Sequence, residues 1–427
     1  MIYKLGDICT ITKGETGIMK AIPGEYAMIT LGEENKTHNE YQFDAKAVIV
    51  QLVSTTGHGH ASMKRVKYFE GKFALGTILC ALIPKDETKV NAKYLQIYLH
   101  ENRERLLVSL MKGAANVSLP IKRLDNVEVV IPSMKIQLEI VEFEKFISNK
   151  RLQFSNEYVI QTQLLSQFRQ SILQEAIQGK LTAEWRSQNP NTEPAAELLK
   201  RIKAEKEKLV KEKKIKQEKP LPAINENEIP FELPEGWVWC RLGEICNRIH
   251  HGYNASAKPE KRDVRLLRIT DIQENQVNWD IVPGCDYTLS DLENYLLDKN
   301  DIVIARTGGT IGKTFLVQDI PVKSLFASYL IRAIPSKEIF ARYLKSFMES
   351  PTYWQKLYDA AWGAGQPNVN GTSLSYLVVS LPPLSEQQAI VAKVEALLGK
   401  CSQLQVEIEK LNAFSKDLLK ALFYEIF

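Results

Sequence analysis

Apolar residues recur at a regular spacing through the middle of the chain. From Met134 to about Lys180, polar and charged residues fill the positions between them, and no Pro or Gly interrupts the pattern before Gly179. Steps of four and three residues are typical of a coiled-coil seam. At ~1.5 Å per residue such a helix is roughly 65–70 Å long, and its one narrow seam needs a partner. The seam positions are Ile136, Ile140, Phe143, Ile147, Phe154, Leu165, Phe168 and Ile172.

The end of the chain carries a second seam of the same kind. Ser385 and Gln388 have the spacing of a capping box, and Pro382 and Pro383 stand just before it, so a helix should begin here. The alternative is that both helices lie on the surfaces of separate globular domains, but two regular seams predict that they pack against each other. The second seam consists of Ile390, Val394, Leu397, Cys401, Leu404, Ile408 and Leu411.

The two halves of the chain resemble each other. Short matches occur in the same order in both halves, separated by about half the chain length, which predicts two copies of one unit, a globular domain followed by a long helix. The matches are Leu5-Gly6-Asp7-Ile8-Cys9 with Leu242-Gly243-Glu244-Ile245-Cys246, Ile83-Pro84 with Ile334-Pro335, Ala92-Lys93-Tyr94-Leu95 with Ala341-Arg342-Tyr343-Leu344, Asn116-Val117 with Asn368-Val369, and Ile131-Pro132 with Leu381-Pro382.

The pattern inside the first copy indicates an α+β domain rather than a parallel α/β sheet. Strand-like runs at residues 26–29, 47–53, 64–69, 78–83 and 127–131 do not alternate regularly with helices, and one helix fits residues 92–110. The predicted boundaries are a first globular domain at 1–132, a first long helix with a short charged helix and a linker at 133–229, a second globular domain at 230–383, and a second long helix at 384–427.

The segment between the two copies is polar. Trp185 to Asn191 reads as a break after the first long helix, and Lys219 to Pro234 reads as a linker. From Ala195 to Lys219, lysine and glutamate alternate at helical spacing. Nucleic-acid contact is one interpretation of these lysines, but the alternation favours a solvated helix.

Composition narrows the class of protein only slightly. The chain has 427 residues, 44% hydrophobic and 25% charged, with a formal net charge of +4, so charge alone does not indicate a nucleic-acid partner. Six scattered cysteines without CxxC spacing read as buried thiols of a reducing compartment. There is no signal-peptide pattern and no apolar run near the ~18 residues of a membrane span, so we expect a cytoplasmic or nuclear protein.

Two polar stretches of the first domain are candidate nucleic-acid-binding loops. In residues 54–67, glycines allow close backbone approach, hydroxyls and imidazoles donate hydrogen bonds, and Lys64, Arg65 and Lys67 can meet phosphates. The alternatives are a solvated hairpin here and an ordinary turn around Asn116, whose amide otherwise suits an adenine edge. No Cys or acidic residue accompanies the histidines at ligand spacing, which argues against a metal. The candidates are Thr55, Thr56, His58, His60, Lys64, Arg65 and Asn116.

The second domain offers a comparable set. Residues 250–254 follow the repeated Leu-Gly-Glu-Ile-Cys strand and read as a polar loop, and a basic segment spans Lys258 to Arg268. Arg306 opens a tight glycine-rich loop, and Gln366 and Asn368 have the amide side chains that pair with adenine. The candidates are His250, His251, Tyr253, Arg306, Thr307, Lys313, Gln366 and Asn368.

The sequence motifs for nucleotide hydrolysis, adenine methylation and DNA cleavage are incomplete in this chain. The stretch from Gly308 to Thr314 resembles a phosphate-binding P-loop, but only three residues separate Gly308 from Gly312, and a strand rather than a helix should follow. The one Pro-Pro, Pro382-Pro383, lacks the amide and the aromatic ring of an adenine methyltransferase loop. No dinucleotide-type glycine motif and no carboxylate–lysine nuclease cluster is apparent. We therefore expect a non-catalytic chain without a cofactor or metal of its own.

Several of these motifs together resemble the specificity subunit of type I restriction-modification systems over essentially the whole chain. They are the two LG(D/E)IC starts, Gly-Lys-Leu-Thr-Ala-Glu-Trp-Arg at the end of the first long helix, Leu-Pro-Glu-Gly-Trp, Thr-Gly-Gly-Thr-Ile-Gly-Lys, and Leu-Pro-Pro-Leu-Ser-Glu-Gln-Gln-Ala-Ile-Val.

The resemblance implies two target recognition domains separated by two long antiparallel helices, in a pseudo-twofold repeat. It further implies a cytoplasmic protein that binds a bipartite site on double-stranded DNA, one half-site per domain. The implied partners are two methyltransferase subunits that use S-adenosylmethionine, and two restriction subunits that use ATP and Mg²⁺. The competing hypothesis is a coiled-coil interaction scaffold without DNA specificity.

Overall fold

The computed structural model describes the chain except residues 57–58, 114–116, 262, 362–368 and 425–427. The described residues form two units. The first comprises residues 1–159 and 409–427, and the second comprises residues 160–408. Two long helices, α5 (Met134–Ile177) and α13 (Leu384–Tyr424), contribute to both units.

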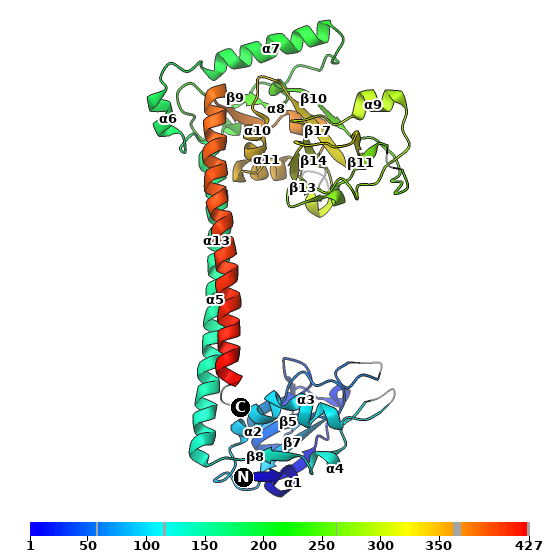
Figure 1. Ribbon diagram of the computed structural model, residues 1–427, viewed down its shortest axis with the longest axis vertical. Coiled ribbons are helices and arrows are strands. Elements are labelled where there is room, and N and C mark those ends of the chain that lie inside the picture. The colour runs from blue at the N-terminus through cyan, green and yellow to red at the C-terminus, as the bar shows by residue number, and fades with distance from the viewer. Residues whose placement is uncertain (57–58, 114–116, 262, 362–368, 425–427) are drawn as a thin grey trace. The chain divides into compact units, whose positions relative to one another are not determined.

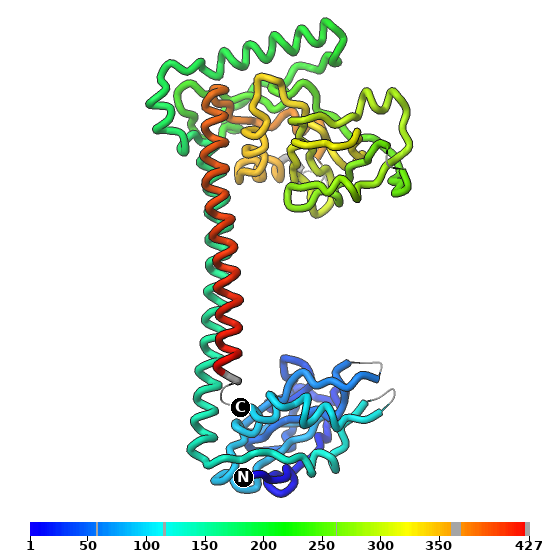
Figure 2. Tube along the Cα trace, viewed as in Figure 1, coloured from blue at the N-terminus to red at the C-terminus, as the bar shows by residue number. Residues whose placement is uncertain are grey.

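Both long helices begin within a residue or two of their predicted starts, and they pack against each other inside each unit. In the second unit, Leu165 and Ile172 of α5 share a buried cluster with Ile390, Val394 and Cys401 of α13. The late part of α5 therefore meets the early part of α13, which makes the pair antiparallel. Figures 1 and 2 show the two helices side by side.

The first unit is built around a six-stranded sheet in the order β2-β7-β5-β6-β3-β4. One face of this sheet packs on α2, whose first turn is capped by the Asn91 side chain, which accepts from the Tyr94 N–H at 3.0 Å. The remaining elements, in chain order, are β1 (Ile2–Lys4), α1 (Leu5–Ile8), β2 (Cys9–Lys13), η1 (Ile18–Lys20), β3 (Tyr26–Ile29), β4 (Lys36–His38), β5 (Phe43–Gln51), β6 (Lys67–Leu75), β7 (Leu79–Pro84), α2 (Ala92–Glu101), α3 (Arg103–Leu106), η2 (Val108–Leu110), α4 (Ile121–Leu124) and β8 (Glu128–Val130).

The second unit has a four-stranded sheet in the order β10-β17-β14-β15, and its largest buried cluster lies between this sheet and the helices α7, α8, α10 and α11. Its elements are α6 (Ala183–Gln188), α7 (Ala195–Lys211), η3 (Glu226–Glu228), β9 (Val238–Arg241), α8 (Leu242–Ile245), β10 (Cys246–His251), β11 (Arg265–Leu267), η4 (Ile269–Asp271), β12 (Ile272–Gln273), β13 (Gln276–Val277), α9 (Leu289–Tyr295), β14 (Ile302–Ala305), η5 (Gly308–Thr310), β15 (Thr314–Leu316), β16 (Ser324–Phe326), β17 (Leu330–Pro335), α10 (Ala341–Phe347), α11 (Pro351–Ala361), α12 (Gly371–Ser375) and β18 (Val378–Leu381).

The two units repeat the same contacts, as the internal matches in the sequence predict. The Gln137 side-chain oxygen accepts from the Asn91 N–H at 2.8 Å, and that of Gln387 accepts from the Phe340 N–H at 2.9 Å. Each amide also donates to the carbonyl of the Pro five residues before it, at 2.9 and 3.0 Å. Both amides are fully buried, so each one ties the start of its long helix to its own globular core.

One of the sequence matches is displaced. The Leu119 N–H donates to the Leu52 carbonyl, and the Val369 N–H donates to the Arg306 carbonyl, at 2.9 and 3.2 Å. Leu119 and Val369 are therefore equivalent, two residues away from the predicted match of Val117 with Val369. A match of two residues in a loop does not establish which positions of the two units are equivalent, whereas equivalent backbone hydrogen bonds do.

The repeated Leu-Gly-Glu-Ile segment is a short helix rather than a strand. In the second unit Glu244 accepts from the Arg241 N–H at 2.7 Å, which caps α8. The strand β10 begins only at Cys246 and continues through His250 and His251, so the predicted polar loop at these two histidines is wrong.

The segment between the copies is more ordered than its polarity predicts. The predicted break contains the short helix α6. The charged helix α7 buries Ala195, Leu198 and Ile202 in the core of the second unit, and the Lys206 ammonium donates to the carbonyls of Gly243 and Cys246 at 2.7 and 3.0 Å. The expectation of a solvated helix therefore holds only for its outer face, because three apolar residues at helical spacing are enough to dock it.

Candidate nucleic-acid interface

The structure brings the two polar stretches of the first unit together. The Ser54 N–H donates to the Val117 carbonyl at 2.9 Å, and an isolated bridge joins Val53 to Ser118. The loop that follows β5 therefore lies beside the segment on which Asn116 was predicted to act. His58 and Asn116 themselves lie outside the described residues.

Hydroxyl groups hold the described part of the first loop. The Ser62 hydroxyl lies 2.8 Å from that of Thr55 and 2.9 Å from that of Thr56, and it accepts from the Thr56 N–H at 3.1 Å. The Ser54 hydroxyl donates to the His60 carbonyl at 2.5 Å. Two of the predicted residues, Thr55 and Thr56, thus spend part of their hydrogen-bonding capacity on the loop itself.

The cations of this loop differ in how they are held. Arg65 pairs with Glu33 at 2.7 Å, and Lys67 donates to the carbonyls of Thr30 and Gly32 at 2.8 and 2.5 Å. Burial and the nearby Arg65 lower the pKa of Lys67. Lys64 is exposed and carries its charge at the surface.

In the second unit three segments converge at the end of the four-stranded sheet. The Tyr253 N–H donates to the Phe326 carbonyl at 2.7 Å, and the Arg306 N–H donates to the Tyr329 carbonyl at 3.0 Å. The Val369 N–H donates to Arg306, so the residue that follows the predicted Gln366 and Asn368 lies beside the predicted Arg306. Gln366 and Asn368 themselves lie outside the described residues.

The absence of a side chain at Gly252 allows the end of β10 to pack closely against the turn before β17. A Cβ on Gly252 would lie 2.2 Å from the Ala327 carbonyl oxygen and 2.4 Å from that of Phe326. Any other residue at this position would push β10 away from the turn before β17. Gly14 has the same role in the first unit, where a Cβ would lie 2.3 Å from the Gly76 carbonyl oxygen.

The two predicted histidines are half-buried rather than freely exposed. The His250 ring lies 5.4 Å from the Phe326 ring and 5.9 Å from the Tyr295 ring. Burial, with the charges of Arg248 and Arg332, lowers the pKa of His250 to about 3, and burial and Arg306 lower that of His251. Both rings are therefore neutral at pH 7. Among the described residues, His250 Nε2 and His251 Nδ1 have no hydrogen-bond partner.

The glycine-rich loop of the second unit is a hairpin turn. The Ala305 N–H donates to the Lys313 carbonyl and the Gly312 N–H donates to the Ala305 carbonyl, at 2.8 and 2.9 Å. Strand β15 begins at Thr314, so the expectation of a strand instead of a P-loop helix is confirmed. The hairpin places Thr307 beside Arg306 and leaves the Lys313 side chain exposed.

The basic segment of the second unit is largely neutralised within the chain. Lys258 and Lys261 both pair with Asp286, and Arg268 pairs with Asp271 at 2.7 Å. Arg265 is buried and donates to the Val282 carbonyl at 2.8 Å. The sequence pattern did not show the pairing of Lys258 and Lys261, because Asp286 lies 25 or more residues away along the chain.

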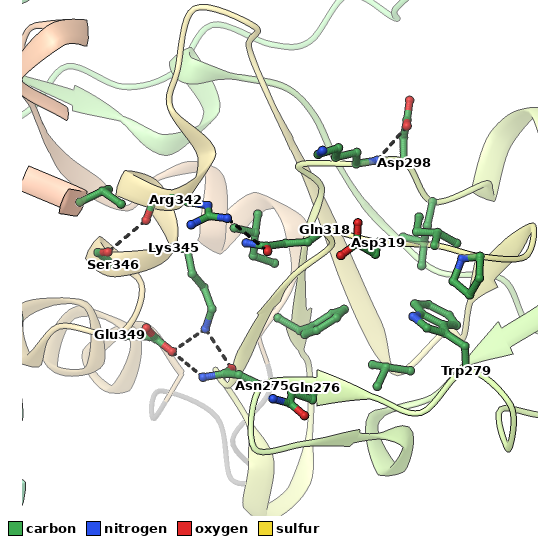
Figure 3. Close-up of a pocket in the computed structure, with 18 of the residues that line it drawn as sticks. Asn275, Gln276, Trp279, Asp298, Gln318, Asp319, Arg342, Lys345, Ser346 and Glu349 are labelled. Atoms are coloured by element: carbon green, nitrogen blue, oxygen red, sulfur yellow. Dashed lines mark hydrogen bonds and ion pairs between the residues drawn. The ribbon is translucent and has the colours of Figure 1, made fainter. Parts of the chain in front are cut away.

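A groove of about 1350 Å³ lies elsewhere in the second unit, between α10, α13, β15 and the loop after it. Lys345 in this groove contacts Asn275 and Glu349 at 3.2 and 2.6 Å, and Arg342 donates to Gln318 at 3.3 Å (Figure 3). Of the predicted nucleic-acid-binding residues that the structure describes, none lines this groove.

Two further properties concern the described residues as a set. They contain no group of three or more His, Cys, Asp or Glu side chains placed to hold a metal ion. None of their helices is long and apolar enough to cross a membrane.

Sequence reasoning missed residues that support the loops from below. Gln51 at the end of β5 donates to the carbonyls of Val53 and Ser62, and the Tyr295 ring of α9 makes a tilted contact with the His250 ring. Tyr329 is 65% exposed beside Arg306. An amide at the end of an apolar strand was a possible signal for Gln51. No sequence signal places Tyr295 or Tyr329.

These features define a chain with two copies of one α+β unit, and in each copy a backbone hydrogen bond joins the residue after the central strand to a residue that follows the second polar stretch. The family model of the type I restriction modification DNA specificity domain matches residues 1–156 and residues 234–412. The chain therefore belongs to the type I restriction modification DNA specificity family.

Curated relatives agree with this membership. The chain is similar to the specificity subunits of the Escherichia coli type I restriction enzymes EcoAI, at 39% identity over 60% of this chain and 43% of that protein, and EcoDI, at 23% identity over 99% of this chain and 87% of that protein. The match to EcoAI and a match at 32% identity to the Escherichia coli EcoEI specificity subunit span less than half of those relatives, 43% and 44% of their length.

Solved structures share the fold. The HsdS subunit from Thermoanaerobacter tengcongensis has a TM-score of 0.55 at 14% identity, covering 100% of this chain and 96% of that chain. A chain from a structure on complex assembly and conformational transition of a type I R-M system has a TM-score of 0.61 at 14% identity, covering 100% and 97%.

Proposed function

We propose that this chain is the sequence-specific DNA-binding subunit of a type I restriction-modification complex. It recognises a bipartite site on double-stranded DNA, one half-site per unit, and directs adenine methylation and cleavage by partner subunits. The observation that carries the proposal is the repetition: the same backbone bond, Leu119 to Leu52 in the first unit and Val369 to Arg306 in the second, joins equivalent segments next to the polar stretches.

The chemistry of the loops suits recognition of a duplex. Exposed Lys64 and Lys313 can meet phosphates, which position the protein without reading sequence. The hydroxyls of Thr55, Thr56 and Thr307 can donate to and accept from base edges. The loops differ in sequence between the units, so the two half-sites should differ.

Partner subunits would dock on the long helices. Several large apolar side chains on exposed faces of these helices are each more than half exposed, including Leu404 and Leu411, so the prediction that these two lie in the seam is wrong. Such exposure is unusual for a protein without a partner there. We propose that these faces bind two methyltransferase subunits that use S-adenosylmethionine, and that two restriction subunits supply ATP- and Mg²⁺-dependent cleavage. The exposed residues include Phe146, Leu152, Leu164, Leu404, Leu411 and Phe414.

The decisive experiment is to map N6-methylated adenines genome-wide in cells with and without this chain, with the partner subunits present in both. We expect a bipartite motif with a fixed gap that is methylated only when the chain is present. Unchanged methylation would contradict the proposal.

A gel-shift series across salt concentrations tests the DNA contact directly. Binding by the complex of this chain with its methyltransferase should weaken steeply as salt rises, because phosphate contacts release counterions. A coiled-coil interaction scaffold without DNA specificity would show no sequence-dependent binding at any salt concentration.

A further inference from the structure

The buried side chain of Gln51 bridges the two ends of the loop that follows β5 in the first unit. Gln51 is the last residue of β5 and is only 3% exposed. Its Nε2 donates to the Val53 carbonyl at 2.9 Å and to the Ser62 carbonyl at 2.8 Å. These two carbonyls lie on opposite sides of the loop, nine residues apart in sequence. A single amide group therefore holds together the residues just after β5 and the segment that leads on to β6.

Thr55 and Thr56 depend on this bridge for their positions. The Thr55 N–H donates to the same Ser62 carbonyl at 3.3 Å, and the Ser62 hydroxyl contacts the hydroxyls of Thr55 and Thr56. The Arg103 side chain donates to the carbonyl of Met63, the next residue, at 3.0 Å. The candidate residues Thr55 and Thr56 thus take their positions from contacts that meet at Ser62.

The second unit achieves the same closure without a side chain. Ala305, the last residue of β14, is the equivalent of Gln51, because the next residues Leu52 and Arg306 make the same ladder bonds. At Ala305 the loop closes through two backbone bonds, to Lys313 and Gly312. A methyl side chain is sufficient there because the hairpin is tight, whereas the longer first loop needs a bridging donor.

We propose that Gln51 is a positioning residue for half-site recognition by the first unit alone. It does not touch DNA. Its amide holds Val53 and Ser62 together and so presents Thr55 and Thr56 to the duplex. This inference rests on the proposed function. It predicts that recognition of one half-site depends on Gln51 and that recognition of the other does not.

The Gln51 side chain is needed for the two hydrogen bonds that its amide group donates, and not only for the space that it fills. Methionine has nearly the same length and shape but donates no hydrogen bond. Gln51→Met should therefore fill the same space and release both carbonyls. The loss of two partly buried hydrogen bonds corresponds to about a tenfold change in the population of the closed loop.

The test uses the complex of the full chain with its methyltransferase subunits and three duplexes. One duplex carries the mapped bipartite site, and each of the others has one half-site scrambled. For each protein the discrimination is the Kd for a scrambled duplex divided by the Kd for the intact site. Gln51→Met should lower this discrimination by about tenfold for one half-site and leave the other within about twofold.

Gln137→Met is the matched control. Gln137 is also a buried amide of the first unit and also donates to two carbonyls, those of Lys89 and Pro132, but at the start of α5 instead of the loop. It should lower the unfolding midpoint without changing either discrimination ratio.

The inference is overturned if Gln51→Met leaves both ratios unchanged, lowers both together, or is matched in its half-site effect by Gln137→Met. If the wild-type complex itself discriminates neither half-site, the proposed function fails as well. The two failures are therefore distinguishable.

Discussion

At the scale of single residues, polar groups buried far from the loops do much of the organising. Glu386, in the first turn of α13, is 1% exposed. Its carboxylate accepts from the Thr182 hydroxyl at 2.7 Å and from the Trp237 indole at 2.8 Å, and it pairs with Arg186. It joins the segment after α5, the entry to the second unit and the start of α13. The glutamate and tryptophan are visible in the sequence motifs, but their meeting is not.

Replacing Glu386 with Ala should destabilise the second unit by about 3 kcal/mol, because it leaves a partly buried guanidinium, a buried indole N–H and a buried hydroxyl without their acceptor. Urea unfolding followed by far-UV circular dichroism, which reports on the helices and strands of both units, measures this change. Ile136→Ala is the control, since Ile136 holds the equivalent position in the first unit and is 45% exposed. Equal losses in the two variants would contradict the assignment.

The half-buried His250 should make stability depend on pH. Its pKa is about 3 in the folded chain against an ordinary value of 6.5, so the unfolded chain binds more protons between these values. Stability should therefore fall as the pH drops below about 6.5. Urea midpoints measured from pH 7.5 to pH 5 should decline less steeply for His250→Gln than for the wild type. Parallel curves for the two proteins would show that His250 is not the group responsible.

At the scale of elements, periodicity predicted what was long and repetitive, and missed what was short. The seams of α5 and α13 are regular over many turns, so their helical state could be predicted without knowledge of their tertiary contacts. The short helices α1 and α8 were predicted as strands, because four residues contain too little periodicity to distinguish the two. The helix α7 combines a charged outer face with three buried residues, and the charges dominated the prediction.

The length of α5 should determine the gap between the two half-sites, because α5 runs from residues of the first unit into residues of the second. Inserting four residues, about one helical turn, near Val159 should change the gap in the methylated motif and leave both half-sites intact. Methylated-adenine mapping in cells that carry the insertion measures this gap. A motif with the original gap would show that the helix is not the spacer. A four-residue insertion in the exposed loop at residues 189–193 is the control and should leave the gap unchanged.

At the scale of the whole molecule, the internal repeat is the most informative feature. The same buried amide, Gln137 or Gln387, and the same buried tyrosine contact occur in both units. In the first the Tyr94 hydroxyl donates to the Val130 carbonyl at 2.8 Å, and in the second the Tyr343 hydroxyl donates to the Ser380 carbonyl at 2.7 Å. The conserved framework and the different loops indicate that each unit is a separate module.

Exchanging residues 1–132 for the corresponding domain of another family member should therefore change one half-site of the methylated motif and preserve the other. The reason is that the described residues of these loops form hydrogen bonds with residues of their own unit, as for Ser54 with Val117. Sequencing of methylated DNA from cells with the chimaera measures both half-sites. Changes in both would refute the modular interpretation. An exchange of residues 230–383 is the reciprocal control and should alter the opposite half-site.

The α+β class, the two copies and the pairing of the long helices followed from the sequence alone, because apolar spacing and repeated segments extend over many residues and survive local exceptions. The composition of the loops also followed from it, including His58, Asn116, Gln366 and Asn368, which lie outside the described residues. Only the tertiary structure decided which loops meet, which histidines are buried, and which lysines are already paired. Those outcomes depend on contacts between residues far apart in the chain, such as Gln51 with Ser62 and Thr182 with Glu386, and no local pattern contains that information.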